Sequence, residues 1–231
     1  NMQLRDYSKD LGVIPAVSFA GPADNPLVRL VPAETCKPED LEKHWEVALR
    51  YFRGEEVDFE ELFATRTVWM VIGPFANEDG FSGHNAVYAP EKGIDLSAVY
   101  DGLEGKVSWK KHSEQEGRLS VDFTKIYKPT ENACTYALCY VTSPKEEKVQ
   151  VRVGTNDSGK VWLGEKLILD YAQEGTAYLD REIIPVTLSA GTTPILLKIC
   201  NGDNNWGFVF RVTDVDGRPA KGLRYSLVPP K

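Results

Sequence analysis

The sequence predicts a mainly β protein, an antiparallel β-sandwich preceded by a short helical N-terminal segment. From Thr67 onward, roughly ten short segments rich in β-branched and aromatic residues follow one another, many with apolar and polar residues in alternation. Glycine, proline, asparagine and aspartate residues separate these segments and predict tight turns. Helical patterns do not alternate with the strands, so a parallel α/β sheet is not expected.

The N-terminal part, residues 1–65, has a different pattern. Prolines interrupt residues 1–35, which predicts irregular structure. Pro38-Glu39-Asp40 is typical of the first turn of a helix, and apolar residues at helical spacing continue it to a stop at Gly54. A second short helix is predicted over 58–63. We expect residues 1–65 to pack on, or to link to, a β-sandwich domain over residues 66–231.

The β part divides into segments that end at turn residues. The predicted strands cover residues 67–72, 106–111, 118–123, 134–141, 148–153, 160–163, 166–169, 182–188, 194–199 and 207–212. The segment 73–105 contains few strand signals and several glycines. A connection of this length is usually functional or folds as a structured excursion on the domain.

One hairpin is specified closely. Strands 160–163 and 166–169 are joined by the two residues Gly164 and Glu165. A type II′ turn requires positive φ at its first central position, which glycine adopts at little cost. The sequence therefore predicts a tight hairpin with a type II′ turn at Gly164-Glu165.

Composition and charge exclude some partners. The net charge is −7, whereas a nucleic-acid partner requires a basic face, so no nucleic-acid partner is expected. No apolar run approaches the ~20 residues of a membrane span. The chain begins at Asn1 without a basic and apolar leader, so a secretion signal is not visible.

The four cysteines show neither a CxxC motif nor metal-ligand spacing. Cys134 and Cys139 lie five residues apart on one predicted strand, so their side chains should point to opposite faces and not pair with each other. Buried free thiols are favoured over a disulfide for Cys36, Cys134, Cys139 and Cys200, although the disulfide state stays open.

A run of motifs resembles a known kind of domain. These are VWMVIGPFANEDG (68–80), APEKGIDLSAVYDGLEGKVSWK (89–110), the stretch YALCYVTSPKEEKVQVRVGTNDSGKVWLGEKLI (136–168), VTLSAGTTPILLKICN (186–201) and WGFVFRVTDVDG (206–217). Their order is similar to the galactose-binding-like and protective-antigen-type, lectin-like domains of large secreted or surface bacterial proteins. The resemblance covers residues 66–231. It implies a jelly-roll sandwich, an extracellular or periplasmic location, and an accessory role beside carbohydrate-active enzymes.

Signatures of catalysis are missing from the sequence. It contains no GxSxG nucleophile motif, no P-loop and no GxGxxG motif. Of the three histidines, His84 is in a loop of functional character, but three scattered histidines do not make a zinc site. Carboxylates near strand ends, such as Asp157, Asp170 and Asp180, keep a glycoside hydrolase open as a less favoured alternative. We expect that the chain is not an enzyme.

Binding chemistry is concentrated in one loop. Aromatic rings contact the C–H faces of sugars, and planar polar groups bind their hydroxyls. Residues 201–206 combine amides, a carboxylate and an indole, and strand-end loops of a jelly roll cluster at the ends of the sandwich. The predicted ligand-binding residues are therefore Asn156, Asp157, Tyr171, Asp203, Asn204, Asn205 and Trp206. Trp109 and Trp162 on a sheet face form a second, less favoured surface.

Two further expectations concern metals and partners. Jelly-roll sandwiches often hold a structural calcium through loop carboxylates, and Asp157 and Asp203 are the candidate ligands here. No other cofactor is expected. The expected partner is a carbohydrate or a neighbouring domain of the same polypeptide, and the alternative function is a structural or protein-interaction spacer attached to a larger enzyme.

Overall fold

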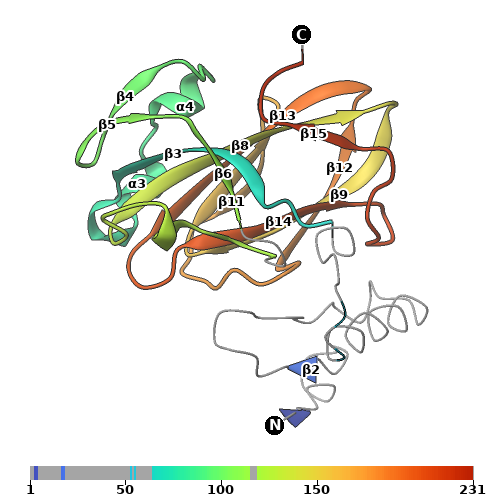
Figure 1. Cartoon of the computed structure of the whole chain (residues 1–231), viewed down its shortest axis with the longest axis horizontal. Helices are drawn as coiled ribbons and strands as arrows, with labels where there is room; N and C mark the ends of the chain where they lie inside the picture. The colour runs from blue at the N-terminus through green and yellow to red at the C-terminus, as the bar shows by residue number, and fades with distance from the viewer. Residues whose placement is uncertain are drawn as a thin grey trace.

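Two antiparallel sheets pack face to face in the C-terminal part of the chain (Figure 1). The computed structural model describes residues 3–4, 17–18, 53, 55, 64–114 and 119–230. The arrangement confirms the prediction of a mainly β, antiparallel sandwich. The boundary proposed at residue 66 stays a prediction. The helices predicted over 38–54 and 58–63 lie outside the described residues, apart from Arg53.

The larger sheet has the strand order β11-β10-β13-β8-β3-β6, and β15 pairs with β8 beyond the end of β3. Long central strands form its middle, and shorter strands form its edges. The strands are β3 (Val68–Ala76), β6 (Lys110–Ser113), β8 (Ala133–Ser143), β10 (Gly159–Leu163), β11 (Lys166–Tyr171), β13 (Gly191–Asn201) and β15 (Arg224–Ser226).

The smaller sheet has the strand order β12-β9-β14-β7. Its strands are β7 (Val121–Asp122), β9 (Glu147–Asn156), β12 (Glu182–Leu188) and β14 (Gly207–Thr213). Pro185 lies in β12, an edge strand, where a missing N–H does not interrupt a central ladder.

The core lies between the two sheets and follows the period-2 alternation of the strands. Each strand turns alternate side chains inward, and β-branched and aromatic residues fill these positions. Edge-to-face contacts of Trp69 with Phe208 and Phe210, each with 5.2 Å between ring centroids, join the sheets at the centre. The inward residues include Val71, Ala137, Val149, Val151, Val153, Val161, Ile195, Leu197 and Val212.

Residues 77–109 form an excursion that covers the outer face of the larger sheet. The predicted connection 73–105 is thus a structured excursion, and its first residues belong to β3. It contains the 3-10 turn η2 (Glu78–Gly80), the short helices α3 (Ser82–Asn85) and α4 (Ala89–Lys92), and the hairpin of β4 (Val99–Gly102) and β5 (Gly105–Ser108). A second apolar cluster forms beneath it, with Tyr136, Leu138 and Leu196 from the sheet and Tyr88 and Ile94 from the excursion. The outer face of this sheet is therefore a second core.

The hairpin of β10 and β11 has the predicted turn. Leu163 pairs with Lys166 across the two-residue loop. Gly164 has φ 61°, and Glu165 is not among the residues with positive φ, which is the pattern of type II′. A register shift after Val161 adds one residue, Ile168, to the β11 side and bends this edge strand.

Two predicted strands differ from the structure. Residues 106–111 form β5 and β6, which pair with different strands, because the buried Trp109 lies where the chain passes from the excursion to the sheet. Of the predicted strand 118–123, the described residues 119–123 contain a strand at Val121–Asp122 alone, because the Asp122 carboxylate accepts a hydrogen bond from Thr124 N (3.0 Å) and starts a 3-10 turn. Strands β4 and β15 were not predicted.

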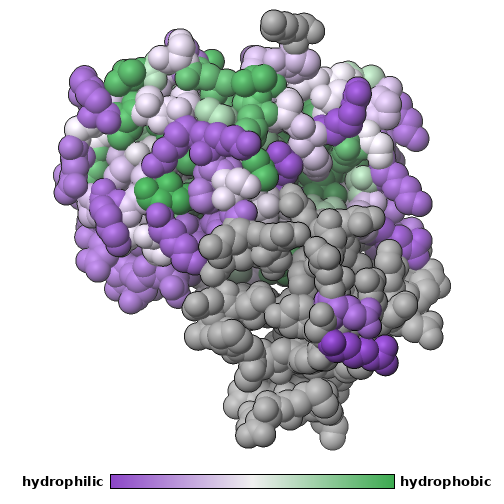
Figure 2. Space-filling model, viewed as in Figure 1, coloured by the Kyte–Doolittle hydropathy of each residue, from purple (hydrophilic) through white to green (hydrophobic). Residues whose placement is uncertain are grey.

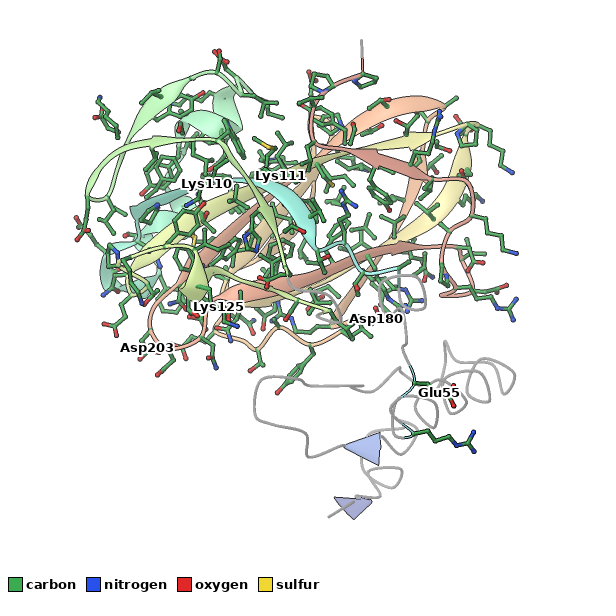
Figure 3. All side chains as sticks on the ribbon, in the orientation of Figure 1. Glu55, Lys110, Lys111, Lys125, Asp180 and Asp203 are labelled. Atoms are coloured by element: carbon green, nitrogen blue, oxygen red, sulfur yellow. A yellow bond between two sulfur atoms is a disulfide. The ribbon has the colours of Figure 1, made fainter. Side chains whose placement is uncertain are left out.

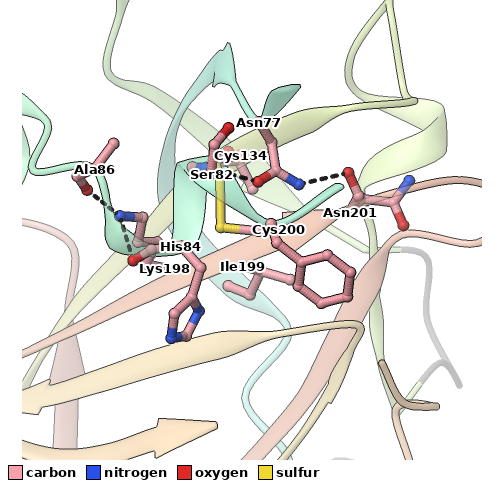
Figure 4. The surroundings of a disulfide bond; sticks show 12 residues. Asn77, Ser82, His84, Ala86, Cys134, Lys198, Ile199, Cys200 and Asn201 are labelled. Carbon is pink, nitrogen blue, oxygen red and sulfur yellow. Dashed lines mark hydrogen bonds between the residues drawn. A yellow bond between two sulfur atoms is a disulfide. The ribbon is translucent and has the colours of Figure 1, made fainter. Parts of the chain in front are cut away.

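The cysteine prediction is partly wrong. Cys134 and Cys200 are directly opposite each other on β8 and β13 and form a disulfide (Figure 4). Cys139 points to the opposite face of β8 and is a buried free thiol, as predicted. Cys36 lies outside the described residues. The sequence pattern could not predict the disulfide, because the bond depends on the pairing of two strands that are far apart in the sequence.

Near the N-terminus, β1 (Gln3–Leu4) and β2 (Val17–Ser18) form a two-stranded antiparallel pair. In the described part of the chain, each helix is too short or too polar to cross a membrane.

Candidate functional site

Asp157 connects three chain segments at one end of the sandwich. It lies in the turn between β9 and β10, where its main-chain oxygen accepts a hydrogen bond from Thr155 Oγ1 (2.7 Å). Its carboxylate oxygens accept hydrogen bonds from Gly202 N (3.0 Å) and Gly175 N (3.4 Å). The β9–β10 turn is thereby fastened to the connections β11–β12 and β13–β14.

Asn77 fastens the excursion to the same end. This fully buried side chain donates from Nδ2 to Asn201 O (2.9 Å) and Gly80 O (2.7 Å), and its Oδ1 accepts from Gly83 N (2.9 Å). Figure 4 shows the Asn77 amide aimed at Asn201, above the disulfide.

Residues 129–132 complete this end. Asn132 N donates to Gly202 O (2.9 Å), and Asn201 Nδ2 donates to Thr130 O (2.8 Å). We call the resulting surface the loop end, and define it as residues 77–82, 129–132, 155–158, 172–178 and 201–206. Figure 3 labels Asp203 in this region, at the lower left, and the same region is hydrophilic in Figure 2.

The structure brings most of the predicted binding residues together at the loop end. Asp203, Asn204 and Asn205 are exposed, and Asn204 Nδ2 donates to Asp203 Oδ1 (2.7 Å). Asn204 has φ 60°, a left-handed conformation that asparagine tolerates better than most residues. Asn156 is half-buried, next to Asp157. The loop 203–205 therefore offers two amides and a carboxylate to solvent on a hydrogen-bonded base.

Tyr171 lies at the margin of the loop end. The guanidinium of Arg181 is 3.9 Å from the centroid of the Tyr171 ring, and the Tyr171 hydroxyl donates to Glu174 O (3.3 Å). Arg181 also donates to Thr155 O (2.6 Å), so the pair holds the β11–β12 connection against β9. Tyr171 thus presents one ring face to Arg181 instead of to solvent.

Trp206 was wrongly assigned to the binding surface. It is 1% exposed, its indole N–H donates to Ile199 O (3.3 Å), and its ring packs 5.3 Å from that of Phe123. The residue directly precedes β14, where the chain enters the core between the sheets. Its ring is therefore a core element with no face open to a ligand.

The second predicted surface, around Trp109 and Trp162, is largely covered. Trp109 is 7% exposed beneath the excursion, and Trp162 is half-buried against the same apolar cluster. The two rings line one sheet face as expected, but that face is not a free sugar platform.

The carboxylates of the candidate calcium ligands accept hydrogen bonds from other groups of the chain. Both Asp157 oxygens accept backbone N–H groups, and Asp203 accepts from the neighbouring Asn204 amide. Residues 64–114 and 119–230 contain no group of three or more histidine, cysteine, aspartate or glutamate side chains that could hold a metal ion.

A buried polar network anchors the excursion to the larger sheet. Lys198 on β13 has no exposed surface, and its Nζ donates to Ala86 O (2.5 Å) and His84 O (3.3 Å) (Figure 4). The same Nζ donates to Glu91 Oε1 (2.9 Å). Tyr136 donates to the same Glu91 carboxylate. Burial lowers the pKa of Lys198, while the hydrogen bond to Glu91 raises it. With no exposed surface, the amine is inaccessible to a substrate.

His84 is paired but enclosed. Its Nε2 lies 2.7 Å from Asp170 Oδ1 on the edge strand β11, which makes Nε2 the donor to an ionised carboxylate. Burial lowers the pKa of His84; Lys160 and Lys198 act in the same direction, and Asp170 opposes them. The imidazole is therefore neutral near pH 7, and at 2% exposure it fastens α3 to the sheet edge.

The carboxylates considered for glycoside hydrolysis are likewise bound to other groups. Asp180 is fully buried between Arg152 (2.6 Å) and Arg211 (2.6 Å to Nε), which face each other on β9 and β14. Burial raises its pKa, but the two guanidinium groups more than offset this and leave the pKa lowered. Asp170 pairs with His84 and Asp157 with backbone N–H groups, so these aspartates hold segments in place.

Sequence reasoning missed Asn77 and Arg181, which build the loop end. Asn77 stands in the turn sequence Asn77-Glu78-Asp79-Gly80, where asparagine reads as an ordinary turn residue. No sequence signal distinguishes such a residue from one that is buried and bonds to a distant strand.

Comparison with known proteins gives limited structural similarity. No protein-family model and no curated protein matches the sequence. A β-glucosidase from Kluyveromyces marxianus, solved with glucose, has a TM-score of 0.40 and 13% identity over 63% of this chain and 16% of its own. The PA14 domain of the antifreeze protein MpAFP has a TM-score of 0.37 and 11% identity over 76% of this chain and 92% of its own.

A third similar structure is the Epithelial Adhesin 9 A domain from Candida glabrata, solved with Galb1-3GlcNAc. Its TM-score is 0.40 and its identity 12%, over 71% of this chain and 91% of its own. This chain thus spans about a sixth of the glucosidase and most of the two separate domains. At these TM-scores the similarity establishes neither a shared family nor a shared function.

Proposed function

We propose that this chain is a non-catalytic β-sandwich module that binds carbohydrate at the loop end. The observation that supports this most directly is the meeting of five separate segments on one surface. The side chains of Asp157, Asn77 and Asn201, together with backbone hydrogen bonds of Asn132, hold them there. That surface exposes the carboxylate and amides of residues 203–205, which are the planar polar groups that bind sugar hydroxyls.

The module is proposed to act as an accessory domain of a larger secreted or surface bacterial protein, as its resemblance in sequence implies. The Cys134–Cys200 disulfide supports an oxidising compartment. The enclosed state of His84, Lys198 and Asp180 supports a role without catalysis, since none of these groups is open to a substrate.

Affinity electrophoresis against plant, algal and host polysaccharides, with and without calcium, tests the proposal. We expect retardation by at least one polysaccharide and its loss in the double variant Asn204→Ala/Asn205→Ala. The matched control is Asn85→Ala, an exposed asparagine on α3. The absence of retardation with every polysaccharide would refute the proposal.

A groove of about 500 Å³ favours a second candidate, a spacer that docks a neighbouring domain. It lies where the edge strands β11 and β12 leave the sandwich open, and its lining includes Leu163, Ile168 and Val186 between Lys148 and Lys166. In the full-length protein, Ile168→Asp would release the neighbouring domain if this candidate is correct, which limited proteolysis would detect.

A further inference from the structure

We propose that Phe81 is the stacking residue of the carbohydrate site and that this site takes uncharged saccharides and excludes anionic glycans. The inference rests on the proposed function and deepens it. It arises from an aromatic ring, a contact between two loops and the charge of the loop end.

The ring of Phe81 is one of the large apolar side chains left open to solvent, with 42% of its surface exposed. Its backbone is fixed within the tight turn between η2 and α3. Phe81 N and Ser82 N both donate to Asp79 Oδ1 (3.3 and 3.1 Å), and Phe81 O accepts from His84 N (3.0 Å). A solvent-facing ring on a fixed backbone loses little entropy when a ligand stacks on it.

The turn that holds Phe81 touches the loop that holds the amides. A Cβ added to Gly80 would lie 3.4 Å from the Cα of Gly202, so the two backbones are in direct contact. Phe81 and Asp203 are the residues that follow these glycines, and both are exposed. The ring therefore belongs to the same surface as the amides of Asn204 and Asn205.

Together these groups match the chemistry of a sugar ring. A pyranose has an apolar face of C–H groups, which packs on an aromatic ring, and a rim of hydroxyls, which amides and carboxylates bind. The indole that the sequence suggested for this purpose, Trp206, is in the core. Phe81 supplies the aromatic face that the site would otherwise lack.

The charge of the loop end selects among saccharides. Its five segments contain no lysine, arginine or histidine, and their carboxylates have the same sign as the net charge of −7. Arg181, which lies outside these segments, donates its guanidinium hydrogens to Thr155 O, Thr155 Oγ1 and Thr176 O. A uronate or a sulfate brought to this surface therefore meets mainly like charges, which opposes association. The acidic residues are Glu78, Asp79, Glu131, Asp157, Glu174 and Asp203.

The test uses affinity electrophoresis of the whole chain with neutral galactan, mannan and xyloglucan. It also uses a matched pair, polygalacturonate and its methyl ester, which share one sugar backbone and differ in whether the carboxyl groups are ionised or esterified. For a neutral polysaccharide that binds, we expect Phe81→Ala to weaken binding about fivefold or more, and Phe81→Tyr to retain it. Val99→Ala, at a 60% exposed valine on β4, is the control and should bind like the wild type. Binding should persist in about 0.5 M NaCl, since no ion pair is involved.

The outcomes separate the two proposals. Wild-type binding that Phe81→Ala leaves unchanged, with the melting temperature also unchanged, would overturn the role of Phe81 and leave the proposed function standing. Binding to polygalacturonate but not to its ester or the neutral polymers would overturn the charge selection. No binding by the wild type to any saccharide, charged or neutral, would overturn both.

Discussion

Replacing Asn77 with alanine tests whether the loop end depends on one buried amide. The substitution removes three hydrogen bonds and leaves Gly83 N, in a buried position, without its acceptor. An orphaned buried N–H costs about 1–3 kcal/mol, and the two lost carbonyl contacts add about 0.5–1 kcal/mol each. We therefore expect the free energy of unfolding to fall by about 3 kcal/mol.

Urea unfolding followed by tryptophan fluorescence measures this loss, and the melting temperature should fall by about 6–12 °C for a domain of this size. Asn85→Ala removes an exposed asparagine eight residues away and should change the stability by less than about 0.5 kcal/mol. A loss below about 1 kcal/mol for Asn77→Ala would show that water or rearranged loops replace the amide, and would refute the reasoning. Sugar binding by the variant should weaken even under conditions where it remains folded, because Gly80 and Phe81 lose their anchor.

The remaining predictions concern titration, the disulfide and calcium. The pKa of His84 lies below its ordinary value of 6.5, so the unfolded chain binds the proton first as the pH falls below 6.5. Wild-type stability should therefore decrease as the pH falls below 6.5, and His84→Gln should flatten that decrease in urea titrations; equal slopes would contradict the assignment. The double variant Cys134→Ala/Cys200→Ala opens a link between residues 66 positions apart and should lose about 4 kcal/mol of stability, and mass spectrometry without reductant should find the two cysteines joined in the wild type. Because the Asp157 oxygens accept backbone N–H groups, calcium should leave the melting temperature unchanged, whereas an increase at millimolar calcium would restore the metal site that the sequence suggested.

The strands and the β10–β11 hairpin were predictable because their signals are local. Alternation such as that of Val149, Val151 and Val153 is enough to assign a strand and its inward face. The type II′ turn needs only Gly164 in the correct place. The meeting of Asp157 with the loop 201–205 was also predictable, because strand-end loops of a sandwich gather at its two ends.

The failures have a common physical origin in contacts between distant segments. Lys198 was not singled out from the sequence, because a lysine in a strand carries no local signal of burial; the excursion covers it and supplies its partners. The pairing of Cys134 with Cys200 follows from the register of β8 and β13, which no local pattern reveals. Trp206 and Asn205 are adjacent in sequence, but only the three-dimensional path of the chain decides which one enters the core.

The way the loop end is fastened has a consequence for how such a domain diversifies. Its hydrogen bonds run from a few inward side chains, Asp157 and Asn77 above all, to backbone N–H and C=O groups, which every residue type except proline provides in full. The exposed side chains of residues 203–205 are not needed to hold the loops in place. Sequence drift at Asp203 and Asn205 would alter recognition at little cost in stability, whereas Asn204, with φ 60°, is restricted to residues that tolerate the left-handed region. Related chains should therefore keep the fastening residues while their ligand preference diverges.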